Sequence, residues 1–132
     1  MKMKIHHIGY LVKAIEEAEE KFANLGYLTI APKVYDEIRK IEIVFLKKDG
    51  VVVELVSPVS EDSPVASLIK RVGNSPYHIC YSSENFEEDI VKLRSEGWMK
   101  LGQPERAPAL ENKNVVFLIH SVVGMIEVLD NH

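Results

Sequence analysis

Two histidines and two glutamates stand where side chains of these types need a binding partner. Glu54 and Glu127 each interrupt a strongly apolar run of residues. A carboxylate buried in such a strand costs several kcal/mol unless something compensates its charge. His7 and His78 lie in short β-prone runs. Two imidazoles and two carboxylates suit a divalent ion of the Zn, Ni, Co or Mn type, and four protein ligands leave one or two positions for water or substrate.

An internal repeat relates these residues in two pairs. Residues 7–27, HIGYLVKAIEEAEEKFANLGY, align without a gap on residues 78–98, HICYSSENFEEDIVKLRSEGW. Later in each half, residues 53–56 (VELV) resemble residues 126–129 (IEVL). A lone histidine or glutamate in a strand is more often structural or solvated. The repeat favours metal ligation, because each half runs from a histidine near its start to a glutamate near its end.

Hydrophobic period and turn residues predict the order β-α-β-β-β in each half. Apolar residues at helical spacing predict helices over residues 15–25 and 86–93. Gly26 and Gly97 stand where a left-handed C-terminal cap belongs, and Ser82 or Ser83 could cap the second helix at its N-terminus. The predicted strands cover residues 5–12, 27–32, 41–48 and 51–57, then 77–82, 98–102, 114–120 and 123–129.

A short ordered helix is predicted between the halves. Asp62 or Ser63 would be its N-cap, Pro64 its first residue and Gly73 its end. The chain is therefore expected to have an α+β fold with two tandem βαβββ modules. One domain would cover residues 1–132, with module one at 4–58, the linker helix at 59–74 and module two at 75–132.

The composition excludes several classes of function. The chain has 132 residues, 46% of them hydrophobic, and a formal net charge of -4, which argues against nucleic acid or an anionic membrane as partner. Cys80 is the only cysteine, so no internal disulfide can form and a reducing compartment is expected. No signal peptide or membrane-spanning run is recognised, and we expect a cytoplasmic protein.

The neighbours of the two histidines have structural interpretations. Cys80 follows His78 by two residues and shares its face, where a small core residue is the simplest interpretation. Tyr10 and Tyr81 match across the repeat, three residues after each histidine. An odd spacing in a strand turns them away from the ligands, so we expect them to pack in the core.

The paired modules with His7, Glu54, His78 and Glu127 resemble the vicinal oxygen chelate superfamily. This group includes glyoxalase I, methylmalonyl-CoA epimerase, fosfomycin-modifying enzymes, extradiol dioxygenases and bleomycin-binding proteins. The resemblance covers essentially the whole chain and is greatest to the epimerases, in the stretches VELVSP, EDSPVA and YHI. It implies a curved mixed sheet around a metal cleft, and a homodimer.

The chain departs from the epimerase pattern outside the ligands. Arg39 and Lys40 stand where epimerases usually carry a Gln-Gly pair. Residues 108–114 (PALENKN) replace a glycine-rich turn, and His120-Ser121 stand in place of a lysine. These differences fall in loops that would face the substrate.

The resemblance implies that the metal stabilises charge on a substrate oxygen while a neighbouring C–H proton leaves. A carboxylate would move that proton, and the candidates are Glu127 and the loop residue Glu37. Glu54 would stay a ligand. Arg39, Lys40 and Arg106 could hold an anionic substrate group, although loop cations are usually only solvated.

The expected function is therefore a metal-dependent epimerase or isomerase. Its substrate would be an acyl-CoA or another anionic carbonyl compound. The alternatives are a lactoylglutathione lyase of the glyoxalase I type and a drug-binding protein on the same fold. The filled set of four ligand positions favours the enzyme.

Overall fold

The computed structural model describes residues 1–132, which form two compact units. The N-terminal unit comprises residues 7–77, and the C-terminal unit comprises residues 78–132 together with residues 1–6. The domain limits expected from the sequence stay a prediction. None of the helices combines the length and the apolar character that crossing a lipid bilayer requires.

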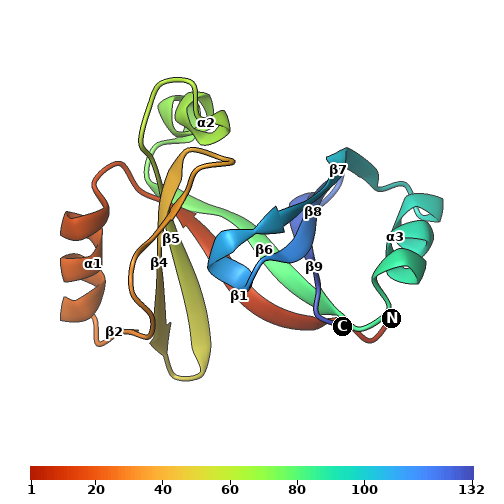
Figure 1. Cartoon of the computed structure of the whole chain (residues 1–132), viewed down its shortest axis with the longest axis horizontal. Helices are drawn as coiled ribbons and strands as arrows, with labels where there is room; N and C mark the ends of the chain where they lie inside the picture. Colours follow the sequence, from red (N-terminus) through yellow and green to blue (C-terminus); the bar gives the residue numbers. More distant parts are fainter. The chain divides into compact units, whose positions relative to one another are not determined.

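Apart from the additional strand β3, the helices and strands follow the order that the repeat predicts (Figure 1). In chain order they are β1 (Lys4–Leu11), α1 (Ile15–Asn24), β2 (Leu28–Thr29), β3 (Val34–Asp36), β4 (Ile41–Lys48), β5 (Val51–Pro58), α2 (Pro64–Val72), β6 (Ser75–Ser83), α3 (Phe86–Ser95), β7 (Met99–Ala107), a short 3-10 helix (Pro108–Leu110), β8 (Lys113–His120) and β9 (Gly124–Asp130).

Both units have the same strand order. Read from the first strand of each module, the N-terminal unit has the order β1-β5-β4-β2 and the C-terminal unit has the order β6-β9-β8-β7. The additional strand β3 lies beside β4. β1 pairs in parallel with β5 and β6 pairs in parallel with β9, while the other pairs within each unit are antiparallel. The predicted α+β class with mixed strand pairing is confirmed.

The edge strands differ most from the prediction. β2 covers only Leu28–Thr29 instead of residues 27–32, and Pro32 has no N–H with which a strand ladder could continue. The strand β3 was not predicted. β7 continues to Ala107 instead of ending at residue 102, and its register shifts between Leu101 and Glu105. Such a bulge is hard to predict from alternation, since it breaks the period of two.

The helix ends test the predicted caps. Gly26 and Gly97 have φ values of 102° and 99°, as predicted for residues that end a helix in the left-handed region. The prediction that Ser82 or Ser83 caps α3 was wrong, because Asn85 is the N-cap. Ser83 instead ends β6 and donates a hydrogen bond of 2.6 Å to Asp89.

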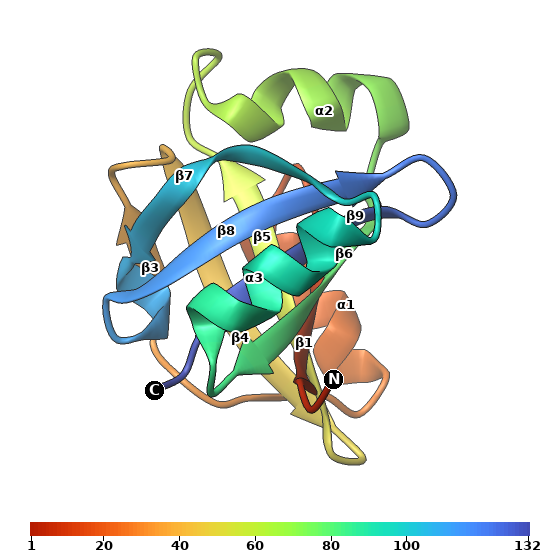
Figure 2. The same ribbon diagram turned by 90° about the vertical axis from the view of Figure 1, so that its right-hand side faces the viewer.

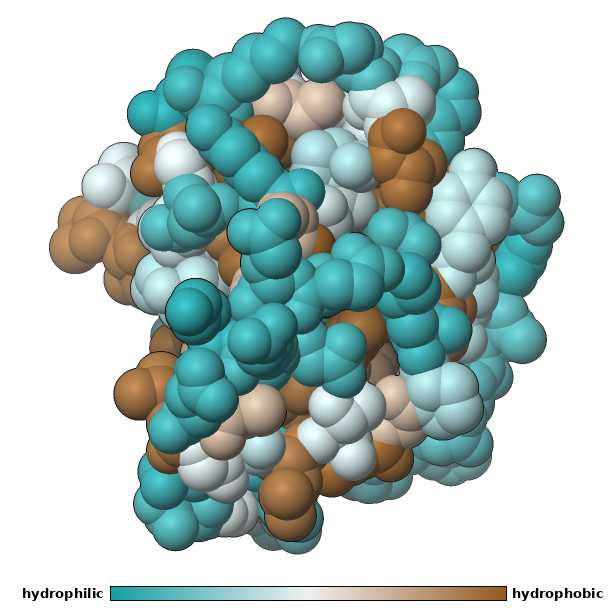
Figure 3. Space-filling view, turned by 90° about the vertical axis from the view of Figure 1, so that its left-hand side faces the viewer, coloured by the Kyte–Doolittle hydropathy of each residue, from teal (hydrophilic) through white to brown (hydrophobic).

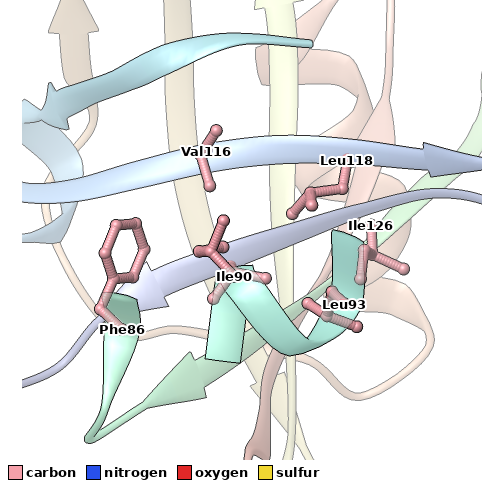
Figure 4. Close-up of a cluster of buried hydrophobic side chains, with 7 residues drawn as sticks. Phe86, Ile90, Leu93, Val116, Leu118 and Ile126 are labelled. Atoms are coloured by element: carbon pink, nitrogen blue, oxygen red, sulfur yellow. The ribbon is translucent and has the colours of Figure 1, made fainter. Parts of the chain in front are cut away.

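Each unit buries one helix against its sheet. In the C-terminal unit α3 lies across β8 and β9 (Figure 2). Phe86, Ile90 and Leu93 meet Val116, Leu118 and Ile126 (Figure 4). Val128 belongs to the same cluster, and Tyr81 packs against it.

In the N-terminal unit α1 packs on β4 and β5 through Ile15 and Phe22. Tyr10 meets Phe22 edge to face, with 5.2 Å between ring centroids. The packing roles expected for Tyr10 and Tyr81 are confirmed. Hydrophilic side chains cover much of the face on which α1 lies (Figure 3).

The linker helix α2 is capped as predicted and is tied to the turn after β3. Ser63 is the N-cap, Pro64 follows it, and Gly73 ends the helix with a φ of 71°. The Ser63 hydroxyl donates a hydrogen bond of 2.8 Å to the carbonyl of Arg39. The helix start therefore depends on the conformation of the turn at residues 37–40.

Asp36 holds that turn together. Its carboxylate accepts backbone hydrogen bonds from Ile38 at 2.9 Å and from Arg39 at 3.0 Å, and a third of 2.8 Å from the Arg39 guanidinium. The side chain is almost fully buried. A carboxylate with three donors is stable in the interior, whereas the same donors without it would be left unsatisfied.

We therefore expect Asp36→Ala to lower the free energy of unfolding by about 2–4 kcal/mol, because it leaves the Arg39 guanidinium and two backbone N–H groups without their acceptor. Asp62→Ala is the matched control, since Asp62 pairs with Lys40 at the exposed side of the same turn. The control should change stability little. Urea unfolding followed by circular dichroism measures both; equal midpoints for the two variants would contradict the role assigned to Asp36.

Candidate metal centre

The first candidate pair lies on the central strands of the N-terminal unit. β1 runs parallel to β5, and Gly9 is the residue opposite Glu54. His7 precedes Gly9 by two residues, so its side chain is on the same face as that of Glu54. His7 Nε2 lies 3.5 Å from Glu54 Oε1. Only 1% of His7 and 6% of Glu54 is exposed.

The second pair repeats this geometry in the C-terminal unit. β6 runs parallel to β9, and Cys80 is the residue opposite Glu127. His78 precedes Cys80 by two residues, and its Nε2 atom lies 3.2 Å from Glu127 Oε1. His78 and Glu127 are each 5% exposed. The sequence repeat is therefore also a repeat of strand register. Cys80 is fully buried, in agreement with its interpretation as a core residue.

An aromatic ring accompanies each histidine. Phe45 is opposite Glu54 across the antiparallel pair of β4 and β5, and Phe117 is opposite Glu127 across β8 and β9. The ring centroid of Phe45 lies 5.6 Å from that of His7, and the centroid of Phe117 lies 5.2 Å from that of His78. Both contacts are edge to face, which restrains the imidazole planes.

These two phenylalanines have no part in the sequence-based assignment of the site. The signal for them was nevertheless present, since residues 43–46 (IVFL) match residues 115–118 (VVFL) in the repeat.

The spacing within each pair fits two ligands of one metal ion. Donors at about 2.1 Å from an ion are about 3.0 Å apart at a right angle and about 3.4 Å apart at a tetrahedral angle. The observed separations are 3.5 Å and 3.2 Å. A direct charge-assisted hydrogen bond would be shorter, about 2.7–2.9 Å. Each buried pair is therefore compatible with a divalent metal ion.

The loop residue proposed as a base has a different environment. Glu37 is exposed in the turn after β3. The buried carboxylate of this segment belongs to its neighbour Asp36, which sequence reasoning missed. The catalytic role of Glu37 stays a prediction.

The three candidate anion-binding cations have protein partners. Arg39 Nη1 lies 2.8 Å from Asp36 Oδ2, and Lys40 forms an ion pair with Asp62. Hydrogen bonding to Lys40 lowers the pKa of Asp62 below its usual value. Arg106 Nη1 donates a hydrogen bond of 3.0 Å to Asn112 Oδ1. Each of these three side chains therefore already has a partner within its own unit and would have to give it up to bind a substrate anion.

Known proteins resemble this chain over most of its length. The ethylmalonyl-CoA/methylmalonyl-CoA epimerase of Cereibacter sphaeroides is 27% identical over 117 residues, which is 87% of each chain. The human mitochondrial methylmalonyl-CoA epimerase is 23% identical over 116 residues, covering 87% of this chain and 65% of the human protein. An uncharacterized protein of Bacillus subtilis is 26% identical over 93 residues, covering 70% of this chain and 66% of that protein.

Solved structures share the fold. A hypothetical protein of Bacillus halodurans has a TM-score of 0.88 at 24% identity and covers 100% of this chain and 96% of its own. The Streptomyces coelicolor methylmalonyl-CoA epimerase in complex with 2-nitronate-propionyl-CoA has a TM-score of 0.83 at 21% identity. The match covers 96% of this chain and 93% of the epimerase chain. The model of one family matches residues 6–117. The chain therefore belongs to the glyoxalase/bleomycin resistance protein/dioxygenase superfamily.

Proposed function

We propose that this protein is a divalent-metal-dependent epimerase or isomerase that moves a proton next to a carbonyl group. The observation that carries the proposal is the duplicated, buried His–Glu pair in one strand register. The similarity to methylmalonyl-CoA epimerases supports an acyl-CoA, or another anionic carbonyl compound, as substrate. The homodimer and the cytoplasmic location inferred from the sequence stay predictions.

The metal would be held by His7, Glu54, His78 and Glu127 together. Each unit supplies only two donors, whereas a protein usually holds a catalytic ion with three or more of its own ligands. Two pairs that share one ion satisfy this requirement, and the ion would offset the cost of both buried carboxylates. The nitrogen and oxygen donors suit Zn, Ni, Co or Mn.

When bound, the ion supplies electrophilic stabilisation of negative charge on the substrate's oxygen. The chain's own residues do the rest. Glu127 would give up its place as a ligand when substrate binds and take the proton from the neighbouring carbon, while Glu54 would stay in place as a ligand. Epimerisation needs a second group on the other side of that carbon, and Glu37 is the candidate. Phe45 and Phe117 keep the two imidazoles oriented and water away from the carboxylates.

A metal titration tests whether the pairs share one ion. Tag-free protein is incubated with Co, Ni, Zn or Mn, desalted and measured by atomic emission. We expect about one equivalent per chain for the best metal. Two equivalents would mean that each pair binds its own ion, and less than about 0.2 equivalents with all four metals would rule out the metalloenzyme.

Removal of one ligand should cost affinity rather than fold. Glu54→Gln keeps the side-chain shape and removes a buried charge, so we expect little change in the stability of the metal-free protein. The affinity for the metal should fall at least about 100-fold, because losing only an outer contact already costs 10–100-fold. The stabilisation of about 2.7 kcal/mol that wild type gains at a metal concentration of 100 times its Kd should fall to about 0.4 kcal/mol or less at the same concentration.

Glu20→Gln, an isosteric change on the exposed side of α1, is the control for this experiment. It should leave both the metal affinity and the thermal shift unchanged. Wild-type metal affinity in Glu54→Gln would refute the assignment of Glu54 as a ligand.

Proton exchange tests the reaction. Metal-loaded protein is incubated with methylmalonyl-CoA in deuterated water, and label at the α-carbon is followed by mass spectrometry. We expect exchange in wild type, a rate at least about 100-fold lower in Glu127→Gln, and a smaller reduction of about 10-fold or more in Glu37→Gln. Glu61→Gln, another exposed loop carboxylate, should exchange at the wild-type rate.

The same assay separates the alternatives. Turnover of the methylglyoxal–glutathione adduct without any exchange into methylmalonyl-CoA would identify a lactoylglutathione lyase and overturn the epimerase proposal. Neither activity in a protein that binds metal would mean that the substrate class is wrong.

A further inference from the structure

The sheet of the C-terminal unit has two faces of different character. Val116, Leu118 and Ile126 point toward α3 and form the core (Figure 4). Because successive side chains in a strand alternate, Phe117 and Ile119 of β8 point to the other face. Glu127 lies on that face too, since it is directly opposite Phe117.

Cross-strand pairing extends this face to the edge of the sheet. Residues directly opposite in an antiparallel pair have their side chains on the same side. Met99 is opposite Ile119, Leu101 is opposite Phe117, and Ile119 is opposite Met125. The result is an apolar surface, here called the apolar wall, that continues from Glu127 and consists of Met99, Leu101, Phe117, Ile119 and Met125.

The outer part of the wall is accessible to solvent. Met99 is 64% exposed, Leu101 is 48% exposed and Ile119 is 37% exposed. These three apolar side chains are neighbours on one sheet face, next to a buried carboxylate. Contiguous exposed apolar surfaces of this kind are typical of binding sites, whereas single exposed apolar residues are not.

The fold does not require an apolar residue at this place. The N-terminal unit repeats the arrangement, with Leu28 opposite its partner on β4 as Met99 is opposite Ile119. There the partner is the exposed residue Lys47. A lysine is therefore compatible with this strand register, so the strand pair does not by itself require the isoleucine of the C-terminal unit.

We propose that the apolar wall binds an unbranched alkyl chain of the substrate, whose oxygens bind at the metal centre; this inference rests on the proposed function. Neighbouring strands are about 4.8 Å apart, so Leu101 on β7 lies two strands, or about 10 Å, from Glu127 on β9. The wall therefore suits substrates that extend several carbons beyond the reacting centre, which is longer than the methyl branch of methylmalonyl-CoA.

A series of alkyl hydroxamates, from acetohydroxamate to octanohydroxamate, tests this without turnover. Each chelates a metal through two oxygens and carries a longer alkyl chain. Their affinities are measured from the visible spectrum of the cobalt-loaded protein. In wild type we expect the affinity to rise about two- to fourfold per added methylene over the first several carbons.

Two variants of exposed wall residues should flatten this dependence. Ile119→Lys copies the residue of the N-terminal unit, and Leu101→Gln removes apolar surface at the edge. Both should bind acetohydroxamate as wild type does and gain less than about 1.5-fold per methylene. Val91→Lys, at an exposed apolar residue on α3, is the control and should keep the wild-type slope.

Several results would overturn the inference. A flat chain-length series in wild type, or wild-type slopes in both wall variants, would do so while leaving the metal centre intact. A change of oligomeric state in Ile119→Lys with an unchanged slope would make the wall an interface between copies. If no hydroxamate perturbs the cobalt spectrum, the proposed metal centre fails and the inference fails with it.

Discussion

A carboxylate in the middle of an apolar strand is the constraint on which this structure depends. Glu54 lies on β5, which has β1 on one side and β4 on the other, and Glu127 occupies the same position on β9 between β6 and β8. Neither side chain can reach water by moving to a sheet edge. The strand register therefore has to bring each glutamate a partner, and in both units the partner is a histidine placed diagonally on the parallel neighbour.

The rest of each unit leaves the face of the sheet that carries the histidine and the glutamate free of helices. The helices α1 and α3 cover the opposite face with apolar side chains, and the strand residues Tyr10 and Tyr81 pack against the same core clusters. Parallel pairing of the first and last strands of a module needs a crossover, and the helix with the strands that follow it provides it. The β-α-β-β-β order is thus the connection that places a histidine from the start of a module beside a glutamate from its end.

The sequence was sufficient for those features that a period or a repeat encodes. The α+β class, the long strands, the linker helix with Ser63 and Gly73, and the pairing of His7 with Glu54 and of His78 with Glu127 within each half were all predictable, because the same pattern occurs twice. Features that occur only once in the chain were not predicted. The strand β3, the bulge in β7 and the buried carboxylate of Asp36 depend on backbone hydrogen bonds that no periodicity announces.

The departures from the epimerase pattern also take on a different meaning. The sequence placed them in substrate-facing loops, yet Arg39 pairs with Asp36, which holds the turn after β3, and Lys40 pairs with the exposed Asp62. A cation already paired inside its own turn loses that interaction when it binds a substrate anion, so its net contribution to substrate affinity is small. Lys47 and Ile119 differ between the repeats and lie on the site face of the sheet, and neither holds a turn in place as the Asp36–Arg39 pair does. Selectivity for the substrate can therefore evolve on the strands themselves, while the loops keep the fold in place.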